Sequence, residues 1–74
     1  MGDRLATLTQ REREVLAYVI AGRLNKQIAA SIGTVEKTVK VHRGRMMAKL
    51  GIRSVADLVR LADKAGIAPA QMSG

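Results

Sequence analysis

The stretch from Asn25 to Val39, NKQIAASIGTVEKTV, carries the pattern that decides the fold. Ile28 and Ile32 repeat at the spacing of one helical face, and Gly33 then interrupts the helix. Ala29 is small enough to let the next helix cross closely over this one, and glycine adopts the backbone conformation of a tight turn at little cost. Two helices joined at a steep angle by a short glycine-containing turn form a helix-turn-helix.

Helical patterns and capping residues on both sides of this motif predict an all-α, four-helix domain. Thr9 and Glu12 form a capping box for a first helix, from about Gln10 to Ala21. We expect the later helices to be capped by Asn25, by Thr34 and by Ser54, and to run to Ile32, from Val35 to Leu50, and to about Ala65. The apolar residues expected to face the core are Val15, Leu16, Val19, Ile20, Ile28, Ala29, Ile32, Val39, Met46, Leu50, Val55, Leu58, Val59 and Ala62.

Length and composition limit what the chain can be. It has 74 residues, no Cys and one aromatic residue, Tyr18. We expect one domain over residues 8–67, an N-terminal linker or vector-derived segment over 1–7, and a flexible tail over 68–74. The absence of Cys excludes disulfides and thiolate metal sites. No apolar run reaches the roughly 18 residues of a membrane span and no signal peptide is visible, so we expect a cytoplasmic protein without a membrane partner.

Positive charge is concentrated in the middle of the chain. The whole sequence has 13 Lys and Arg against 6 Asp and Glu, a net charge of +7. Between Arg23 and Arg53 there are eight basic residues and a single acid, Glu36, while the remaining charges balance. A surface that only needs solubility would spread its charge. Confined positive charge indicates a polyanionic partner.

The predicted helix from Val35 to Leu50 places part of this charge opposite the core. At about 100° per residue, its outer face carries Lys37, Lys40, Val41, Gly44 and Ala48. Lysine can donate to guanine edges or phosphates, and valine can pack on a thymine methyl group. Glycine in the middle of a helix costs about 1 kcal/mol relative to alanine, which close approach to another surface would explain. Residues expected to reach phosphates beside the groove are Arg43, Arg45, Lys49 and, in the preceding helix, Lys26.

Other functions fit the residues less well. His42 is the only histidine and has no second ligand, so neither a metal, a cofactor nor enzymatic chemistry is expected. A protein-interaction domain would need an apolar surface where these cations lie. RNA binding usually uses aromatic stacking, which a single Tyr18 does not offer. A cationic membrane helix is the remaining alternative, but the apolar face of this helix is needed for the core.

Four segments of the sequence resemble the LuxR-type helix-turn-helix, in particular the DNA-binding domain of FixJ/NarL-type response regulators. The segments, in order, are Leu8–Leu16, Gly22 followed by Asn25–Ala29, Glu36–Arg43 and Met47–Gly51. The resemblance extends from about Leu8 to Ile67. One departure is Thr34-Val35, where relatives usually have an aliphatic residue and then Ser or Thr, so the cap of the third helix could shift by one residue.

This resemblance implies that the chain regulates transcription by binding double-stranded DNA with its third helix. It implies groove-facing positions at Lys37, Lys40, Val41 and Gly44, and backbone contacts at Lys26, Thr38, His42 and Arg43. We add Asn25, Thr34, Arg45 and Lys49 to the expected backbone contacts, and expect a homodimer on DNA with Leu61 and Ala65 of the fourth helix at its contact. Full-length relatives also have a receiver domain and act on RNA polymerase, so the chain is either an excised effector domain or a stand-alone regulator.

Overall fold

The computed structural model describes residues 4–70 and consists of helices throughout its regular part. A short 3₁₀ turn, η1 (Arg4–Thr7), precedes four α-helices. These are α1 (Gln10–Ile20), α2 (Asn25–Ile32), α3 (Glu36–Leu50) and α4 (Val55–Ala65). The prediction of an all-α, four-helix domain is confirmed. None of the helices in this described part has the length and apolar character that crossing a bilayer requires.

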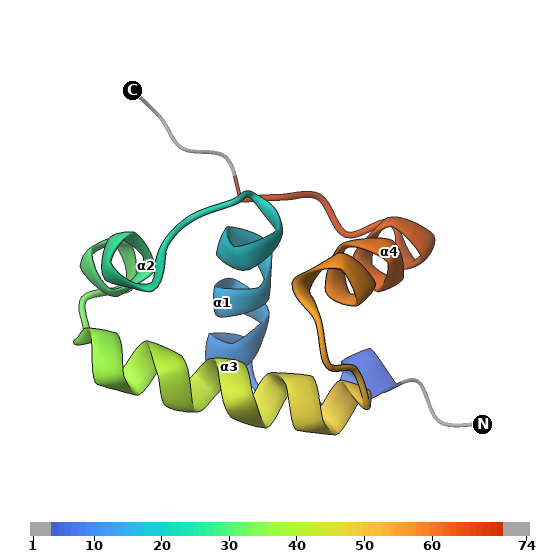
Figure 1. Cartoon of the computed structure of the whole chain (residues 1–74), viewed down its shortest axis with the longest axis horizontal. Coiled ribbons are helices and arrows are strands. Elements are labelled where there is room, and N and C mark those ends of the chain that lie inside the picture. Colours follow the sequence, from blue (N-terminus) through green and yellow to red (C-terminus); the bar gives the residue numbers. More distant parts are fainter. Residues whose placement is uncertain (1–3, 71–74) are drawn as a thin grey trace.

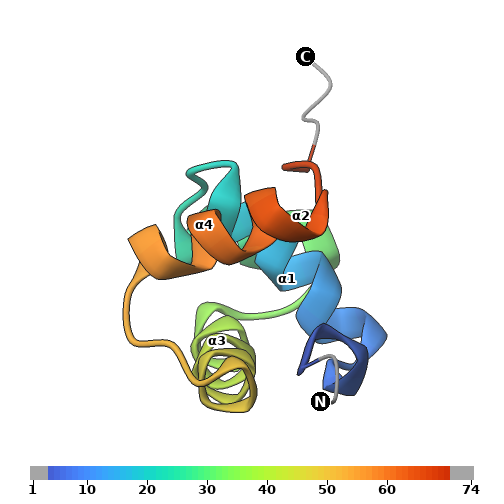
Figure 2. The same ribbon diagram turned by 90° about the vertical axis from the view of Figure 1, so that its right-hand side faces the viewer.

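α3 lies along one side of the molecule. In Figure 1 it runs along the lower edge, with α2 above its first turns, α4 above its last turns and α1 between them. Figure 2 views α3 nearly end-on and shows it at the margin of the fold. It packs against α1, α2 and η1. One face of α3 therefore belongs to the core, while no helix among residues 4–70 covers the other.

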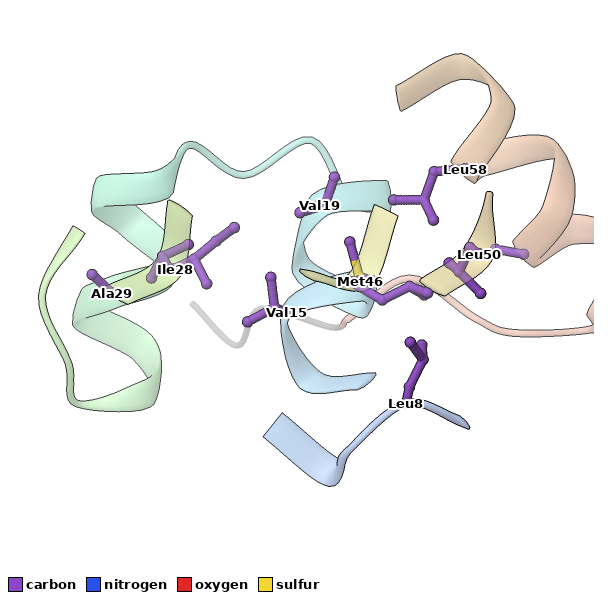
Figure 3. Close-up of a cluster of buried hydrophobic side chains, with 11 residues drawn as sticks. Leu8, Val15, Val19, Ile28, Ala29, Met46, Leu50 and Leu58 are labelled. Carbon is purple, nitrogen blue, oxygen red and sulfur yellow. The ribbon is translucent and has the colours of Figure 1, made fainter. Parts of the chain in front are cut away.

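The core forms where α1, α2, α3 and α4 meet (Figure 3). Four side chains at its centre, Val15, Ile28, Met46 and Leu58, come from the four different helices and have no exposed surface. The rest of the buried apolar set is Leu8, Leu16, Val19, Ala29, Val39, Leu50 and Ala62. Aliphatic side chains and one thioether thus replace the aromatic residues that the sequence lacks.

The turn between α2 and α3 has the predicted glycine geometry. Gly33 has φ +73°, in the left-handed region. Its N–H and that of Thr34 both donate to the carbonyl of Ala29, the latter over 2.9 Å. One of the last four carbonyls of α2 is therefore satisfied within the turn, and α3 begins at Glu36.

The predicted caps of α2 and α3 were wrong by one residue each. The N-cap of α2 is Leu24, and its backbone N–H donates to Oε1 of Gln27 over 2.9 Å, so Asn25 is the first helical residue. The N-cap of α3 is Val35, which provides no side-chain hydrogen bond. Thr34 lies before the cap, and its N–H donates to the carbonyl of Ala29. Thr9 and Ser54 do cap α1 and α4 as predicted.

The structure describes part of each predicted terminal segment. Residues 4–7 form η1, and Leu5 packs against the core. At the other end, the N–H of Ala70 donates to the carbonyl of Ala17 over 2.9 Å, so residues 68–70 lie against α1. Residues on both sides of the predicted span 8–67 therefore contact the helical part of the chain. The remaining parts of the two predictions, residues 1–3 and 71–74, lie outside the described residues.

The inner face of α4 was also predicted only in part. Leu58 and Ala62 are buried, but Val55 and Val59 are 41% and 43% exposed. Leu61, expected at a dimer contact and not in the core, is half-buried and packs on the core. The helix is therefore rotated relative to the prediction. Sequence spacing could not resolve this rotation because Val55, Leu58, Val59, Leu61 and Ala62 are all aliphatic.

A matched pair of leucine substitutions tests this core. Leu58→Ala removes a fully buried side chain and should lower the free energy of unfolding by about 2–5 kcal/mol. Leu24→Ala removes the same atoms from a side chain that is 68% exposed, and it should change the free energy of unfolding by less than about 0.5 kcal/mol. Urea unfolding followed by circular dichroism measures both. Equal losses from the two variants would contradict this core.

Candidate nucleic-acid interface

The uncovered face of α3 carries exposed and unpaired cations. Lys37, Lys40, Arg45 and the preceding helix's Lys26 are exposed, and none has a hydrogen-bond or ion-pair partner among residues 4–70. Val41 lies between them and is 43% exposed. On α3, Lys37, Lys40 and Val41 lie on the side away from the buried residues Val39, Met46 and Leu50. The predicted division of α3 into a core face and an outer face is therefore present in the structure.

Gly44 leaves a gap in this outer face. It is exposed in the middle of α3, and a Cβ atom built on it would meet no atom within 4 Å. It also has none of the positive backbone angles that favour glycine elsewhere in the chain. Neither packing nor backbone conformation within the domain explains a residue that costs helix stability here.

The flank of α3 that faces α2 is held by a direct side-chain contact. Nη1 of Arg43 donates to Oδ1 of Asn25 over 2.6 Å, and both residues are half-buried. Thr38 and His42 are half-buried on α3 as well. Asn25 therefore uses its side chain between helices, which the sequence prediction of a cap missed. A polar residue at the first position of α2 gave no signal of its partner 18 residues away.

An open groove of about 500 Å³ lies beside this contact, at the start of α2. Its lining brings together three cations, Arg23, Lys26 and Arg43, with one acid, Glu36. The cations come from the loop before α2, from α2 itself and from α3. The fold thus extends the positive surface of α3 across to the N-terminus of α2, where backbone N–H groups also favour anions.

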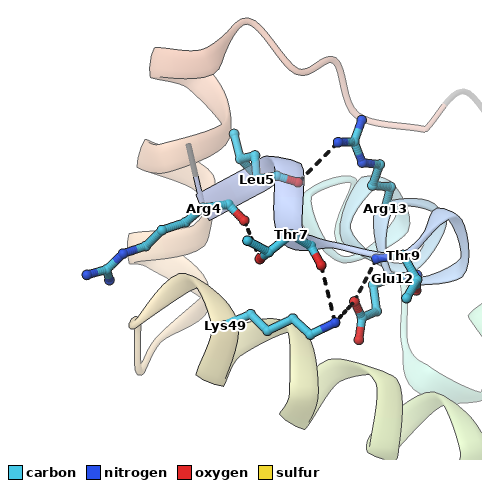
Figure 4. Close-up of polar contacts among 7 residues, drawn as sticks. All are labelled: Arg4, Leu5, Thr7, Thr9, Glu12, Arg13 and Lys49. Carbon is cyan, nitrogen blue, oxygen red and sulfur yellow. Dashed lines mark hydrogen bonds and ion pairs between the residues drawn. The ribbon is translucent and has the colours of Figure 1, made fainter. Parts of the chain in front are cut away.

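Lys49 lies apart from this surface. Its Nζ contacts Oε1 of Glu12 at 2.8 Å and the carbonyl of Thr7 at 3.3 Å (Figure 4). Glu12 is only 2% exposed and also accepts the N–H of Thr9 over 2.8 Å. The Lys49 hydrogen bond, followed by that from Thr9, holds the pKa of Glu12 below its ordinary value, although burial opposes this shift. The ammonium group of Lys49 would have to leave Glu12 and Thr7 to make the phosphate contact that the sequence predicts.

The same region ties the N-terminal turn to the end of α3. Nη1 of Arg4 donates to the carbonyl of Leu50 over 3.2 Å, and Arg13 of α1 donates to the carbonyl of Leu5 over 3.1 Å. Sequence reasoning missed these contacts because it treated residues 1–7 as a linker. The capping box at Thr9 was recognised, but it did not reveal that Glu12 also holds α3.

The two predicted dimer residues differ in exposure. Ala65 is exposed at the end of α4, whereas Leu61 is half-buried against the core. The large apolar side chains exposed on α4 are Val55 and Val59. Within the described residues, His, Cys, Asp and Glu side chains form no group of three that could hold a metal ion.

Together these features define a helix-turn-helix domain whose third helix has a basic outer face. The family of bacterial regulatory proteins of the luxR type matches residues 6–62, and the chain belongs to this family. It is 53% identical over 57 residues to the transcriptional regulatory protein TdiR of Thauera aromatica, covering 77% of this chain and 25% of that protein. It is 46% identical over 70 residues to the transcriptional regulatory protein FixJ of Azorhizobium caulinodans, and the match covers 95% of this chain and 33% of that protein.

Solved structures agree with these sequence relatives. The C-terminal transcriptional activator domain of FixJ from Sinorhizobium meliloti superposes with a TM-score of 0.79 at 43% identity, covering 95% of this chain and 96% of that one. The response regulator StyR gives a TM-score of 0.81 at 51% identity, covering 82% of this chain and 31% of that one. The chain spans about a quarter to a third of the length of the curated relatives that it matches.

The buried ion pair gives a pH-dependent prediction. Because folding lowers the pKa of Glu12, its contribution to stability is present above its ordinary value of 4.5 and is lost as the pH falls through the lowered pKa. Glu12→Gln should cost about 1–3 kcal/mol near neutral pH, since a hydrogen bond to a charged group is lost. The difference from wild type should shrink as the pH falls below 4.5.

Thermal and urea unfolding over a series of pH values measure this difference. Glu14→Gln is the matched control, because Glu14 makes an exposed pair with Arg11 at 3.1 Å that is worth at most about 1 kcal/mol. A cost of Glu12→Gln that stayed constant over the acidic range would show that the carboxylate charge is not what stabilises the fold.

Proposed function

We propose that this chain is the sequence-specific DNA-binding domain of a response regulator and inserts α3 into the major groove of double-stranded DNA. The observation that carries this proposal is the outer face of α3, whose lysines are exposed and unpaired within the described chain. Unpaired cations on one helix of a helix-turn-helix suit contact with phosphates and base edges. The family membership and the transcriptional regulators among the relatives support the same function.

In this proposal, Lys37, Lys40 and Val41 read base edges, while Gly44 allows the DNA to come close to α3. Lys26, Arg43, Arg45, Thr34, Thr38 and His42 contact the sugar-phosphate backbone. Asn25 acts within the same flank of the site. Lys49 is left out of the contacts, because releasing its ammonium group would leave Glu12 buried without its partner.

Assembly and regulation extend the proposal. Two copies bind a two-fold operator, and their α4 helices touch through Ala65 and the exposed edge of Leu61. In the full-length protein a receiver domain precedes this chain and controls this association, and the DNA-bound dimer acts on RNA polymerase. The domain carries no enzymatic activity of its own and works in the cytoplasm.

A salt titration separates specific DNA reading from other functions. Affinity should be measured for a promoter duplex and for a random duplex at several salt concentrations. A DNA reader should lose affinity steeply with salt, by about 0.9 in logarithmic slope per phosphate contact, and should keep its preference for the promoter. Equal and weak binding to every duplex, or preference for single-stranded RNA, would contradict the proposal.

Two lysine substitutions assign the roles within the site. Lys40→Ala should cost about 1–3 kcal/mol on the promoter and reduce the preference over random DNA, because a base contact is lost. Lys26→Ala should weaken both duplexes alike and lower the salt slope by about 1, because only a phosphate contact is lost. Lys64→Ala removes an equal charge from α4 and should change neither. Identical behaviour of the Lys40 and Lys26 variants would overturn the assignment.

Gly44→Ala should change stability and DNA binding in opposite directions. The domain has room for the added Cβ atom, so the free energy of unfolding should rise by about 0.5–1 kcal/mol. DNA affinity should fall, because the methyl group meets the approaching DNA. Unfolding and binding measurements on the same variant test this pair of effects.

Ala48 provides the comparison, since it is also exposed on α3, one turn further along. Ala48→Gly lowers helix propensity by the amount that Gly44→Ala raises it. If helix propensity alone controlled binding, Gly44→Ala would bind more tightly than wild type and Ala48→Gly more weakly. Tighter binding by Gly44→Ala would therefore exclude a close approach at this position.

A further inference from the structure

The contact between Asn25 and Arg43 joins the start of α2 to the middle of α3. Nη1 of Arg43 lies 2.6 Å from Oδ1 of Asn25, which is the shortest side-chain hydrogen bond described in residues 4–70. Both residues are half-buried, so water screens the contact less than it screens an exposed one. Both residues also line the basic groove at the start of α2.

The side chain of Asn25 is free for this contact because α2 does not need it as a cap. Leu24 is the N-cap, and Gln27 accepts the Leu24 N–H. The oxygen of Asn25 therefore has no role within its own helix. Its described partner is Arg43, which is 18 positions later in the chain.

The chemistry of this partner preserves the charge of Arg43. A carboxylate at position 25 would hold the guanidinium and cancel its positive charge, whereas the neutral amide of Asn25 holds it and leaves the charge intact. Glu36 lines the same groove but forms no ion pair with Arg43. A guanidinium has five N–H donors, so four remain for another acceptor after one bonds to Asn25.

We infer that Asn25 is a positioning residue that fixes Arg43 for binding a phosphate of the DNA backbone, and that it does not itself bind DNA. This inference rests on the proposed function of the domain. A long arginine side chain loses conformational entropy when it is immobilised on binding. Because Asn25 already holds Arg43 in the folded protein, this side-chain entropy is lost on folding and not on DNA binding. The guanidinium then has the same position in the free and the bound protein.

A double-mutant cycle with a salt titration tests this inference. The proteins are the wild type, Asn25→Ala, Arg43→Ala and the double variant, each checked for helix content and for an unfolding midpoint above the assay temperature. Asn25→Ala should weaken duplex binding about 2- to 10-fold, the cost of ordering one long side chain, without changing the salt slope. Arg43→Ala should lower the slope by about 0.9, because one phosphate contact is lost. Asn25→Ala should have no further effect in the Arg43→Ala background.

Asn25→Asp separates position from charge. The carboxylate still accepts from Arg43, but it neutralises the guanidinium, so the salt slope should fall nearly as much as in Arg43→Ala.

If Asn25→Ala weakens binding equally with and without Arg43, Asn25 touches the DNA itself and the inference is wrong. If it lowers the unfolding midpoint but leaves affinity unchanged, the contact only stabilises the fold and the inference is again wrong. Failure of the proposed function would look different, because the wild type would then show no salt-dependent duplex binding.

Discussion

Val39 and Met46 are completely buried beneath α3, and their packing on the rest of the core sets the direction of every other side chain on that helix. A helix has a fixed angular step, so burying this pair places Lys37, Lys40, Val41 and Gly44 on the side away from the protein. The basic face is thus a consequence of core packing. α1, α2 and η1 support the proposed DNA site mainly by supplying the surfaces on which α3 packs.

Glu12 supports the same arrangement from the opposite end. Its carboxylate completes the capping box of α1 and also binds Lys49 in the last turn of α3. One buried charge therefore orients two helices relative to each other, and its lowered pKa reflects both contacts. Asn25 and Arg43 make a comparable connection near the start of α3, but with a neutral partner. The charge of Lys49 is balanced by the carboxylate of Glu12, whereas the charge of Arg43 is left unbalanced by its neutral partner.

Much of the fold could be predicted because it depends on local signals. Helical spacing located all four helices, and the capping box at Thr9, the cap at Ser54 and the glycine turn at Gly33 marked their ends. The errors in the N-caps occurred where two neighbouring residues could each act as the cap. Leu24 and Val35 are the N-caps because backbone geometry at the turns chose them, even though Asn25 and Thr34 have better capping side chains. The rotation of α4, which exposes Val59 and covers Leu61, similarly needed the neighbouring helices.

The sequence by itself determined the class of fold, the concentration of charge between Arg23 and Arg53, and the face of α3 on which Lys37, Lys40, Val41 and Gly44 lie. These follow from the periodicity of a single helix and from residue counts. Only the tertiary structure decided which cations are free. Lys49 and Arg43 look equivalent in the sequence, yet one is paired with a buried carboxylate and the other with an amide. Their partners lie far away along the chain, and no local pattern specifies which distant side chains the packed helices bring together.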